Sequence, residues 1–187
     1  LRRTDLDQLT LAPATPDLTG AEIELVDQPA RHLRLTQALE PVQDQYDYII
    51  IDSPPALGLL TLNGLVAAGT VLVPMQCEYF ALEGLSHLME TIELVRGSLN
   101  PTLELEGILL CMYDGRTNLT RQVAQEVRDH FGETVFHTVI PRNVRLGESP
   151  SFGKPALLYD ITSRGAQSYL ELAQELLAYL MAHPGGV

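Results

Sequence analysis

The sequence contains a single lysine, no tryptophan and only two cysteines among its 187 residues. It also lacks any apolar run of the roughly 18 residues that a membrane-spanning helix requires, so we expect no transmembrane segment. No apolar stretch follows Arg2 and Arg3 near the start, and a signal peptide is therefore not predicted. Together these absences favour a cytoplasmic protein without a membrane anchor.

The cysteines and histidines offer neither a disulfide framework nor a metal centre. Cys77 and Cys111 lie in apolar segments typical of strands or strand ends, so we expect buried free thiols. The five histidines are scattered along the chain without the spacing of a metal site. The chemistry of this protein is therefore sought among other residue types.

The charge balance is acidic, with 12 basic against 24 acidic residues and a formal net charge of −12. This excludes a protein coated in basic charge for nucleic acid, but it leaves room for a local basic patch. Hydrophobic residues make up 45% of the chain and charged residues 19%, which is typical of a globular protein. The length suits one domain with a sizeable core, and we expect residues 1–187 to form a single domain.

Short apolar segments alternate with longer helical ones. Several of the short segments are continuously apolar, which is typical of strands buried on both faces of a parallel sheet. We expect strands at 9–12, 47–52, 70–74, 105–112 and 134–140, and helices at 19–25 (with Asp17 as N-cap), 30–39, 61–68, 82–94, 117–131 and 163–181. The alternation predicts an α/β fold, in which helices flank a parallel sheet.

Ligands of such sheets bind beyond the carboxyl ends of the strands, and Asp52 stands at one of these ends. A carboxylate there suits Mg²⁺, which keeps several waters and is commonly held by one or two carboxylates and substrate phosphates. The alternative is that Asp52 caps the turn formed by Ser53, Pro54 and Pro55. The residues alone leave both interpretations open.

Two further strand ends carry arginines. Residues 112–118 form a strand end, a turn with Gly115 and a helix start that Thr117 is placed to cap. Arg116 has no evident partner in this segment, so we expect it to reach an anion outside the chain. Arg142 and Arg145 follow the strand at 134–140, and solvated surface arginines are the simpler interpretation of that pair.

The only lysine, Lys154, follows Gly153 and invites comparison with a phosphate-binding P-loop. That loop requires a preceding strand, a glycine-rich run and a Ser or Thr after the lysine. Pro155 occupies the Ser/Thr position, and no glycine-rich run precedes it. The sequence therefore contains no P-loop.

Six segments, in order along the chain, resemble motifs of the ParA/Soj family of partitioning ATPases. Residues 46–55 (Y-D-Y-I-I-I-D-S-P-P) are similar to the family's Walker B strand, and residues 76–84 (Q-C-E-Y-F-A-L-E-G) match a second motif. The others are residues 14–22 (A-T-P-D-L-T-G-A-E), 112–117 (M-Y-D-G-R-T), 140–146 (I-P-R-N-V-R-L) and 151–155 (S-F-G-K-P). One such motif carries little information, but six in family order are specific.

The resemblance implies a P-loop NTPase fold of the ParA/MinD type that lacks the N-terminal P-loop strand and helix. The chain would be the C-terminal two-thirds of such an ATPase domain. By the same resemblance, Asp52 is the Walker B carboxylate that acts on Mg²⁺ through water. Pro141 and Arg142 line the adenine pocket with Met112 close by, and Arg116 and Arg145 hold DNA.

The implied function is ATP hydrolysis in chromosome or plasmid segregation, with Mg²⁺ as cofactor. The resemblance further implies an ATP-dependent homodimer, binding to DNA without sequence preference, a ParB-type partner that stimulates hydrolysis, and a cytoplasmic, nucleoid-associated location. Family members open with a P-loop that carries two lysines. Since Lys154 fills neither role, the chain by itself is expected to be inactive and to be a fragment.

Two alternatives to a ParA-type ATPase remain. The first is a non-catalytic module of the family that has no P-loop and binds DNA or a partner protein. The second is a MinD-type ATPase recruited to membranes or a bacterial tyrosine kinase. The helix at 163–181 has no basic amphipathic face, and no tyrosine cluster ends the chain, so the second alternative is disfavoured.

Overall fold

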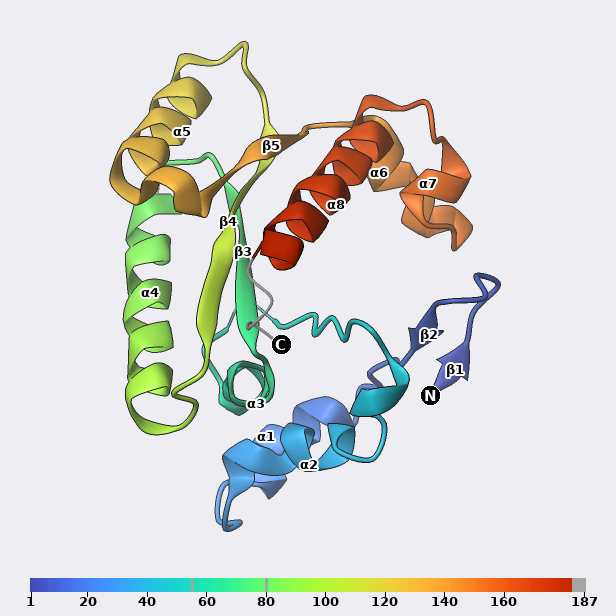
Figure 1. The fold of residues 1–187 in the computed structure, drawn as a ribbon, viewed down its shortest axis with the longest axis vertical. Coiled ribbons are helices and arrows are strands. Elements are labelled where there is room, and N and C mark those ends of the chain that lie inside the picture. Colours follow the sequence, from blue (N-terminus) through green and yellow to red (C-terminus); the bar gives the residue numbers. More distant parts are fainter. Residues whose placement is uncertain (55, 80, 183–187) are drawn as a thin grey trace. The chain divides into compact units, whose positions relative to one another are not determined.

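The computed structural model describes residues 1–54, 56–79 and 81–182, which divide into two compact units, Leu1–Ala68 and Gly69–Val187. Figure 1 shows the elements of both. No helix among the described residues is long and apolar enough to cross a membrane.

The second unit is built on a parallel sheet with strand order β3-β4-β5. In Figure 1, α4 and α5 lie along one face of this sheet and α8 lies on the other. The strands are β3 (Thr70–Gln76), β4 (Glu104–Tyr113) and β5 (Val135–Pro141), and the helices are α4 (Ala81–Ser98), α5 (Asn118–Phe131), α6 (Val144–Glu148), α7 (Ala156–Tyr159) and α8 (Arg164–Ala182). The expected α/β fold with a parallel sheet is confirmed.

The central strand β4 is buried on both faces, as the apolar run at its centre, residues 107–112, predicts. Ile108 and Leu110 have no exposed surface, while Leu109 between them packs with Phe136 and Ile140. Because side chains alternate along a strand, the first two face α4 and α5 when Leu109 faces α8. Leu172 and Leu176 of α8, one helical turn apart, pack against that cluster.

Gly107 of β4 allows a close approach between neighbouring strands. A Cβ atom at this position would lie 2.6 Å from Cε2 of Phe136 and 2.9 Å from the backbone oxygen of Thr134. Both distances are shorter than real Cβ contacts, and the second involves backbone. The ring of Phe136 therefore occupies the space that any larger residue at position 107 would need.

Glu175 of α8 binds the backbone of β5 where the pairing between β4 and β5 is irregular. The N–H groups of His137 and Thr138 donate to its carboxylate at 2.6 and 2.9 Å. Burial raises the pKa of Glu175, but the hydrogen bonds from Thr138 and His137 outweigh it and the net pKa is lowered. The carboxylate thus satisfies two strand donors and attaches α8 to the sheet.

The first unit contains short elements joined by a buried polar network. They are β1 (Arg2–Arg3) paired antiparallel with β2 (Thr10–Leu11), and the helices α1 (Leu18–Glu24), α2 (Arg34–Leu39) and α3 (Leu59–Ala67). The buried Asn63 of α3 accepts from the N–H of Leu35 at 3.1 Å and donates to the carbonyl of Arg31 at 3.0 Å. Asn63 therefore holds the start of α2 against α3.

The strand expected at 47–52 is wrong. These residues belong to neither sheet, and Tyr48 and Ile50 are 58% and 92% exposed. An apolar segment forms a strand only where a neighbour accepts and donates its backbone hydrogen bonds, and the described residues place no strand beside it. The apolar surface that a sheet would bury is therefore left open.

Of the two expected helix caps, Thr117 forms its capping hydrogen bond and Asp17 does not. Asp17 occupies the N-cap position of α1, but its backbone is already helical (φ −63°, ψ −25°) and its side chain makes no capping hydrogen bond; Oδ2 accepts from the Thr15 hydroxyl instead. Thr117 caps α5 as expected, since its hydroxyl oxygen accepts from the N–H of Thr120. Cys77 is a buried free thiol and Cys111 is a half-buried one.

Replacing Gly107 with alanine should destabilise the protein by about 1–3 kcal/mol, because the added methyl overlaps Phe136 and the Thr134 carbonyl. Gly97→Ala is the matched control: this glycine lies in α4 with no atom within 4 Å of the added Cβ, so that change should stabilise by roughly 0.5–1 kcal/mol. Urea unfolding midpoints report both. Equal midpoints for the two variants would contradict the packing at Gly107.

Glu175→Gln should cost about 1 kcal/mol at neutral pH, because an amide replaces a charged acceptor of two N–H groups. The folded pKa of Glu175 is lowered from its ordinary 4.5. The contribution is therefore complete above about pH 4.5 and disappears as pH falls through the folded pKa. Unfolding curves of the two proteins should converge in acid, and a constant difference from neutral to acid would refute the charged role of Glu175.

Candidate functional site

A hollow of about 300 Å³ lies at the carboxyl edge of the sheet, where α/β proteins bind ligands. The ends of β3 and β4, the residue after β5 and the start of α5 all contribute to it. Its lining residues are Gln76, Cys77, Glu78, Met112, Asp114, Thr117, Leu119, Thr120 and Arg142. The hollow therefore combines apolar side chains with charges of both signs.

The structure brings two of the three expected nucleotide-binding residues into this hollow. Met112 and Arg142 line it, while Pro141 ends β5 opposite Tyr113 and is absent from the described lining. The N–H of Arg142 donates to the carbonyl of Tyr113 at 3.1 Å, so the chain after β5 stays attached to the end of β4. Met112 has a positive φ of 53°, a conformation that bulky residues rarely adopt and that recurs at functional sites.

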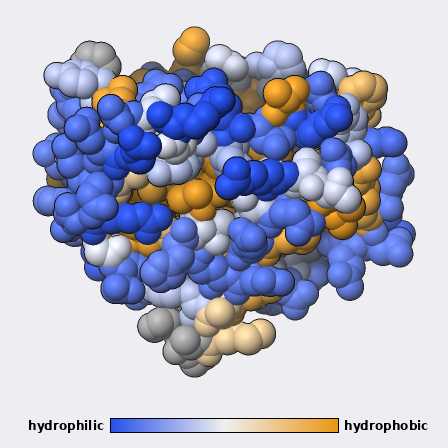
Figure 2. Space-filling view, turned by 90° about the horizontal axis from the view of Figure 1, so that it is seen from above, coloured by the Kyte–Doolittle hydropathy of each residue, from blue (hydrophilic) through white to orange (hydrophobic). Residues whose placement is uncertain are grey.

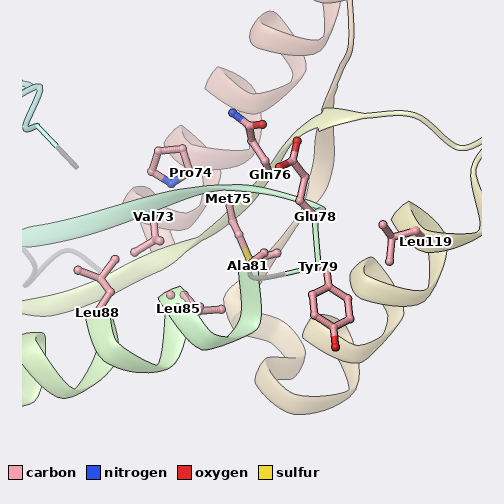
Figure 3. Close-up of a pocket in the computed structure, with 11 residues that line it drawn as sticks. Val73, Pro74, Met75, Gln76, Glu78, Tyr79, Ala81, Leu85, Leu88 and Leu119 are labelled. Carbon is pink, nitrogen blue, oxygen red and sulfur yellow. The ribbon is translucent and has the colours of Figure 1, made fainter. Parts of the chain in front are cut away.

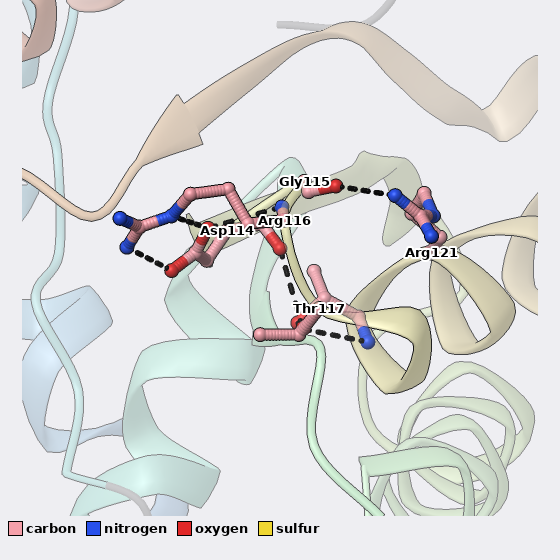
Figure 4. Close-up of polar contacts among 6 residues, drawn as sticks. Asp114, Gly115, Arg116, Thr117 and Arg121 are labelled. Carbon is pink, nitrogen blue, oxygen red and sulfur yellow. Dashed lines mark hydrogen bonds and ion pairs between the residues drawn. The ribbon is translucent and has the colours of Figure 1, made fainter.

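Arg116 does have a partner, contrary to the expectation from sequence. Its Nε donates to Oδ1 of Asp114 at 2.8 Å and its Nη2 donates to Oδ2 at 2.6 Å (Figure 4). These hydrogen bonds lower the pKa of Asp114 to about 2, so the carboxylate stays ionised. The Arg116 side chain is nevertheless 89% exposed, compared with 21% for Asp114.

The turn that carries this ion pair is held together by further hydrogen bonds. The N–H of Arg116 donates to Oδ1 of Asp114 at 3.1 Å, and Nη1 of Arg121 donates to the carbonyl of Gly115 at 2.8 Å (Figure 4). The Thr117 hydroxyl lies 3.3 Å from the carbonyl of Asp114. Sequence reasoning included Asp114 in this segment but missed its pairing with Arg116, although an Asp two residues before an Arg in a glycine-containing turn is a usable signal; it missed Arg121 altogether.

Arg145 is also paired rather than simply solvated. It lies at the start of α6, where its N–H donates to the capping side chain of Asn143 at 2.9 Å. Its guanidinium binds Glu148 at 2.8 Å and lies 3.4 Å from Asp160. Glu148 in turn accepts from the Tyr159 hydroxyl at 3.1 Å, so Arg145 belongs to a small polar network at the protein surface.

A second, larger hollow of about 790 Å³ runs between β3 and α4 (Figure 3). β3 is an edge strand among the described residues, with β4 as its one neighbour, and Pro74 in it lacks a backbone donor, as is typical of edge strands. The lining is mostly apolar: Val73, Pro74, Met75, Gln76, Glu78, Tyr79, Ala81, Gly84, Leu85, Leu88 and Leu119. Figure 2 shows one face of the molecule, on which apolar residues (orange) are interspersed among hydrophilic ones (blue).

Asp52 lies in the first unit, exposed and without a hydrogen bond to any described residue. The expected alternative, a cap on the turn at 53–55, gains no support, although Pro55 lies outside the described residues. The chain just beyond is fixed to α3: the buried hydroxyl of Thr61 donates to the carbonyl of Ala56 at 2.6 Å and lies 3.3 Å from that of Pro54.

An exposed, unpaired carboxylate is compatible with Mg²⁺ held through water, because this ion keeps most of its hydration shell. A protein cage for a metal is not seen. Within the described ranges, no three His, Cys, Asp or Glu side chains are grouped to hold an ion.

Comparison with known proteins identifies relatives for most of the chain. A family model described as an AAA domain matches residues 1–105. The chromosome partitioning protein ParA of Myxococcus xanthus is 60% identical over 177 residues, which cover 95% of this chain and 62% of that protein. Sporulation initiation inhibitor protein Soj of Bacillus subtilis is 56% identical over 178 residues, covering 95% and 70%. The chain thus spans only about three fifths of the Myxococcus protein.

Solved structures agree on the fold. The cobyrinic acid a,c-diamide synthase of Mycobacterium smegmatis, crystallised with ADP and magnesium, aligns with a TM-score of 0.80 at 39% identity, covering 97% of this chain and 66% of that one. The cell division ATPase MinD of Pyrococcus furiosus aligns at 0.65 with 23% identity, covering 79% and 58%, and supports the fold alone. With the sheet, the matched residues and these identities taken together, the chain belongs to the ParA/Soj family and has the fold of ParA/MinD-type P-loop NTPases.

Proposed function

We propose that this chain is the larger part of a Mg²⁺-dependent ATPase that segregates chromosomes or plasmids. The observation that carries the proposal is the 60% identity to a chromosome partitioning protein along almost the whole chain. A protein of the same name from Caulobacter vibrioides is 54% identical, and sporulation initiation inhibitor protein Soj of Bacillus subtilis is 56% identical. The chain would be a continuous part of a single ATPase domain.

Asp52 is assigned to Mg²⁺, which it would hold through water. The assignment is supported by its exposure and by the lack of any hydrogen bond to the described residues. Thr61 stiffens the chain just beyond Asp52 through the carbonyls of Pro54 and Ala56. Mg²⁺ supplies charge stabilisation at the phosphates, and the protein positions the ion and the attacking water.

The hollow at the sheet edge is assigned to the adenine end of ATP. Met112 offers an apolar surface there, and Arg142 sets one side of it, with Pro141 immediately before. The volume of about 300 Å³ is at the small end of the range for ligand pockets. The phosphate-gripping lysines are not among these 187 residues, because Lys154 precedes Pro155 and follows a short 3-10 turn, Ser149–Phe152.

Arg116 and Arg145 are assigned to DNA, bound without sequence preference by an ATP-dependent homodimer in the cytoplasm at the nucleoid. Both arginines are at least half exposed. Because the chain carries a net charge of −12, the binding surface would have to be local, and dimerisation would double it. A ParB-type partner would stimulate hydrolysis.

A second candidate is a non-catalytic module of this family that binds DNA or a partner protein. The observation that favours it is the lack of a P-loop in these 187 residues. The two candidates separate in one assay. The chain is joined to the N-terminal segment of the Myxococcus relative, and ATP hydrolysis is measured with and without DNA. DNA-stimulated turnover supports the ATPase, and its absence supports the module.

In such an active protein, Asp52→Ala should lower Mg²⁺-dependent ATP turnover by a factor on the order of 100 while leaving the folded structure intact. Asp47→Ala provides the control, since this carboxylate is exposed five residues earlier in the same segment. Steady-state hydrolysis at saturating Mg²⁺ measures both. Full turnover in Asp52→Ala would refute the assignment of Asp52.

Arg116→Glu and Arg145→Glu should each abolish retention on non-specific DNA at low salt, because they replace a phosphate contact with a repelling charge. ATP binding should persist in both. Arg96→Glu is the control, because Arg96 is also exposed and paired with a carboxylate, at 2.8 Å from Glu93. The assignment is wrong if the two variants bind DNA as well as Arg96→Glu does.

A further inference from the structure

We propose that Asp114 and Glu148 set the DNA affinity of this protein, by occupying guanidinium groups that a DNA phosphate would otherwise engage. The inference rests on the proposed DNA-binding role of Arg116 and Arg145. It goes beyond that role, because it assigns a function to the carboxylates beside the two arginines. Sequence reasoning placed Asp114 in a candidate segment without giving it a role, and it did not consider Glu148.

The Asp114 carboxylate binds Arg116 in a two-point geometry. Its two oxygens accept from Nε and Nη2, which takes two of the five N–H groups of the guanidinium (Figure 4). Asp114 is largely covered and Arg116 is 89% exposed, so a phosphate has access to the arginine while the carboxylate stays behind it. Arg116 therefore presents free donors to solvent but little net charge.

The second arginine repeats this arrangement on a different element. Glu148 lies one helical turn after Arg145 in α6 and binds it at 2.8 Å. The Tyr159 hydroxyl donates to the same Glu148 oxygen at 3.1 Å, which holds the carboxylate in place from the other side. Asp160 lies 3.4 Å from Nε of Arg145 and adds a second negative charge. Each arginine proposed to contact DNA thus forms an ion pair with a carboxylate of the same chain.

Counterion release explains why these carboxylates matter. A lysine or arginine that neutralises a phosphate frees condensed cations, and this release drives non-specific DNA binding. An arginine already paired with a carboxylate carries less net charge to the DNA and releases fewer cations. Exposed ion pairs are weak, so Asp114 and Glu148 compete with phosphate without preventing its binding. They lower the affinity and keep the binding reversible.

The test is Asp114→Asn and Glu148→Gln in the full-length protein at saturating ATP and Mg²⁺. Each change removes one negative charge but keeps an oxygen that accepts from the Arg116 N–H or the Tyr159 hydroxyl. Anisotropy with a labelled random-sequence duplex, over a series of salt concentrations, gives the Kd and its salt dependence. We expect binding about two- to fivefold tighter for each variant, and a slope of log Kd against log salt steeper by roughly one per arginine.

Glu126→Gln controls for net charge, because Glu126 is exposed on α5 and has no ion pair with any described residue. It should change the Kd less and leave the salt slope unaltered. If Asp114→Asn and Glu148→Gln only match Glu126→Gln, while Arg116→Glu still abolishes binding, the inference is overturned and the proposed function stands. If the unmodified protein does not bind DNA, both are overturned.

Discussion

The parallel ladder of β3, β4 and β5 is the constraint on which the rest of the second unit depends. Because β4 is covered on both faces, the apolar run at its centre is stable only inside this ladder, with α4 and α5 on one face and α8 on the other. The same alignment brings the ends of the strands to one edge, where Met112 and Arg142 line a single hollow. The core thus determines where a ligand could bind.

Charge in this protein is organised in local pairs. Arg116 binds the carboxylate of Asp114, two residues before it in the chain. Arg145 binds the carboxylate of Glu148, three residues after it. Such pairs form within a turn or a helix and do not depend on distant packing. An acidic protein can in this way carry arginines at its surface without creating a broad basic field, and their strength as phosphate ligands becomes adjustable.

The sequence predicted what depends on local periodicity and on motif order. The strands β3, β4 and β5, the long helices and the place of Met112 and Arg142 at the sheet edge all followed from apolar runs and strand ends. The strand at 47–52 was wrong, because its apolar pattern says nothing about whether a partner strand is present. Contacts between distant residues, such as Glu175 with the β5 backbone, were invisible for the same reason.

The sequence also did not reveal the partner of Arg116, although this partner lies only two residues away in the chain. Whether an Asp two residues earlier can reach a guanidinium depends on the backbone of the turn around Gly115, which composition does not specify. Asp52 was likewise recognisable from sequence as a carboxylate, whereas its exposed position, without a hydrogen bond to any described residue, was not. At these positions the sequence shows which side chain is present but not which other side chains it contacts.

Within the described residues, β3 has a neighbouring strand on one edge only, and this open edge affects how the protein responds to heat. Pro74 is the one residue of β3 without a backbone N–H, and the hollow beside the strand is lined in part by Val73, Met75 and Leu88. Such an edge is a template for intermolecular strand pairing once neighbouring segments loosen. Heating would then produce aggregates faster than refolding, and the apparent melting temperature would vary with scan rate and protein concentration. For this chain, resistance to heat is therefore set by the rate of unfolding and aggregation and not by the free energy of unfolding.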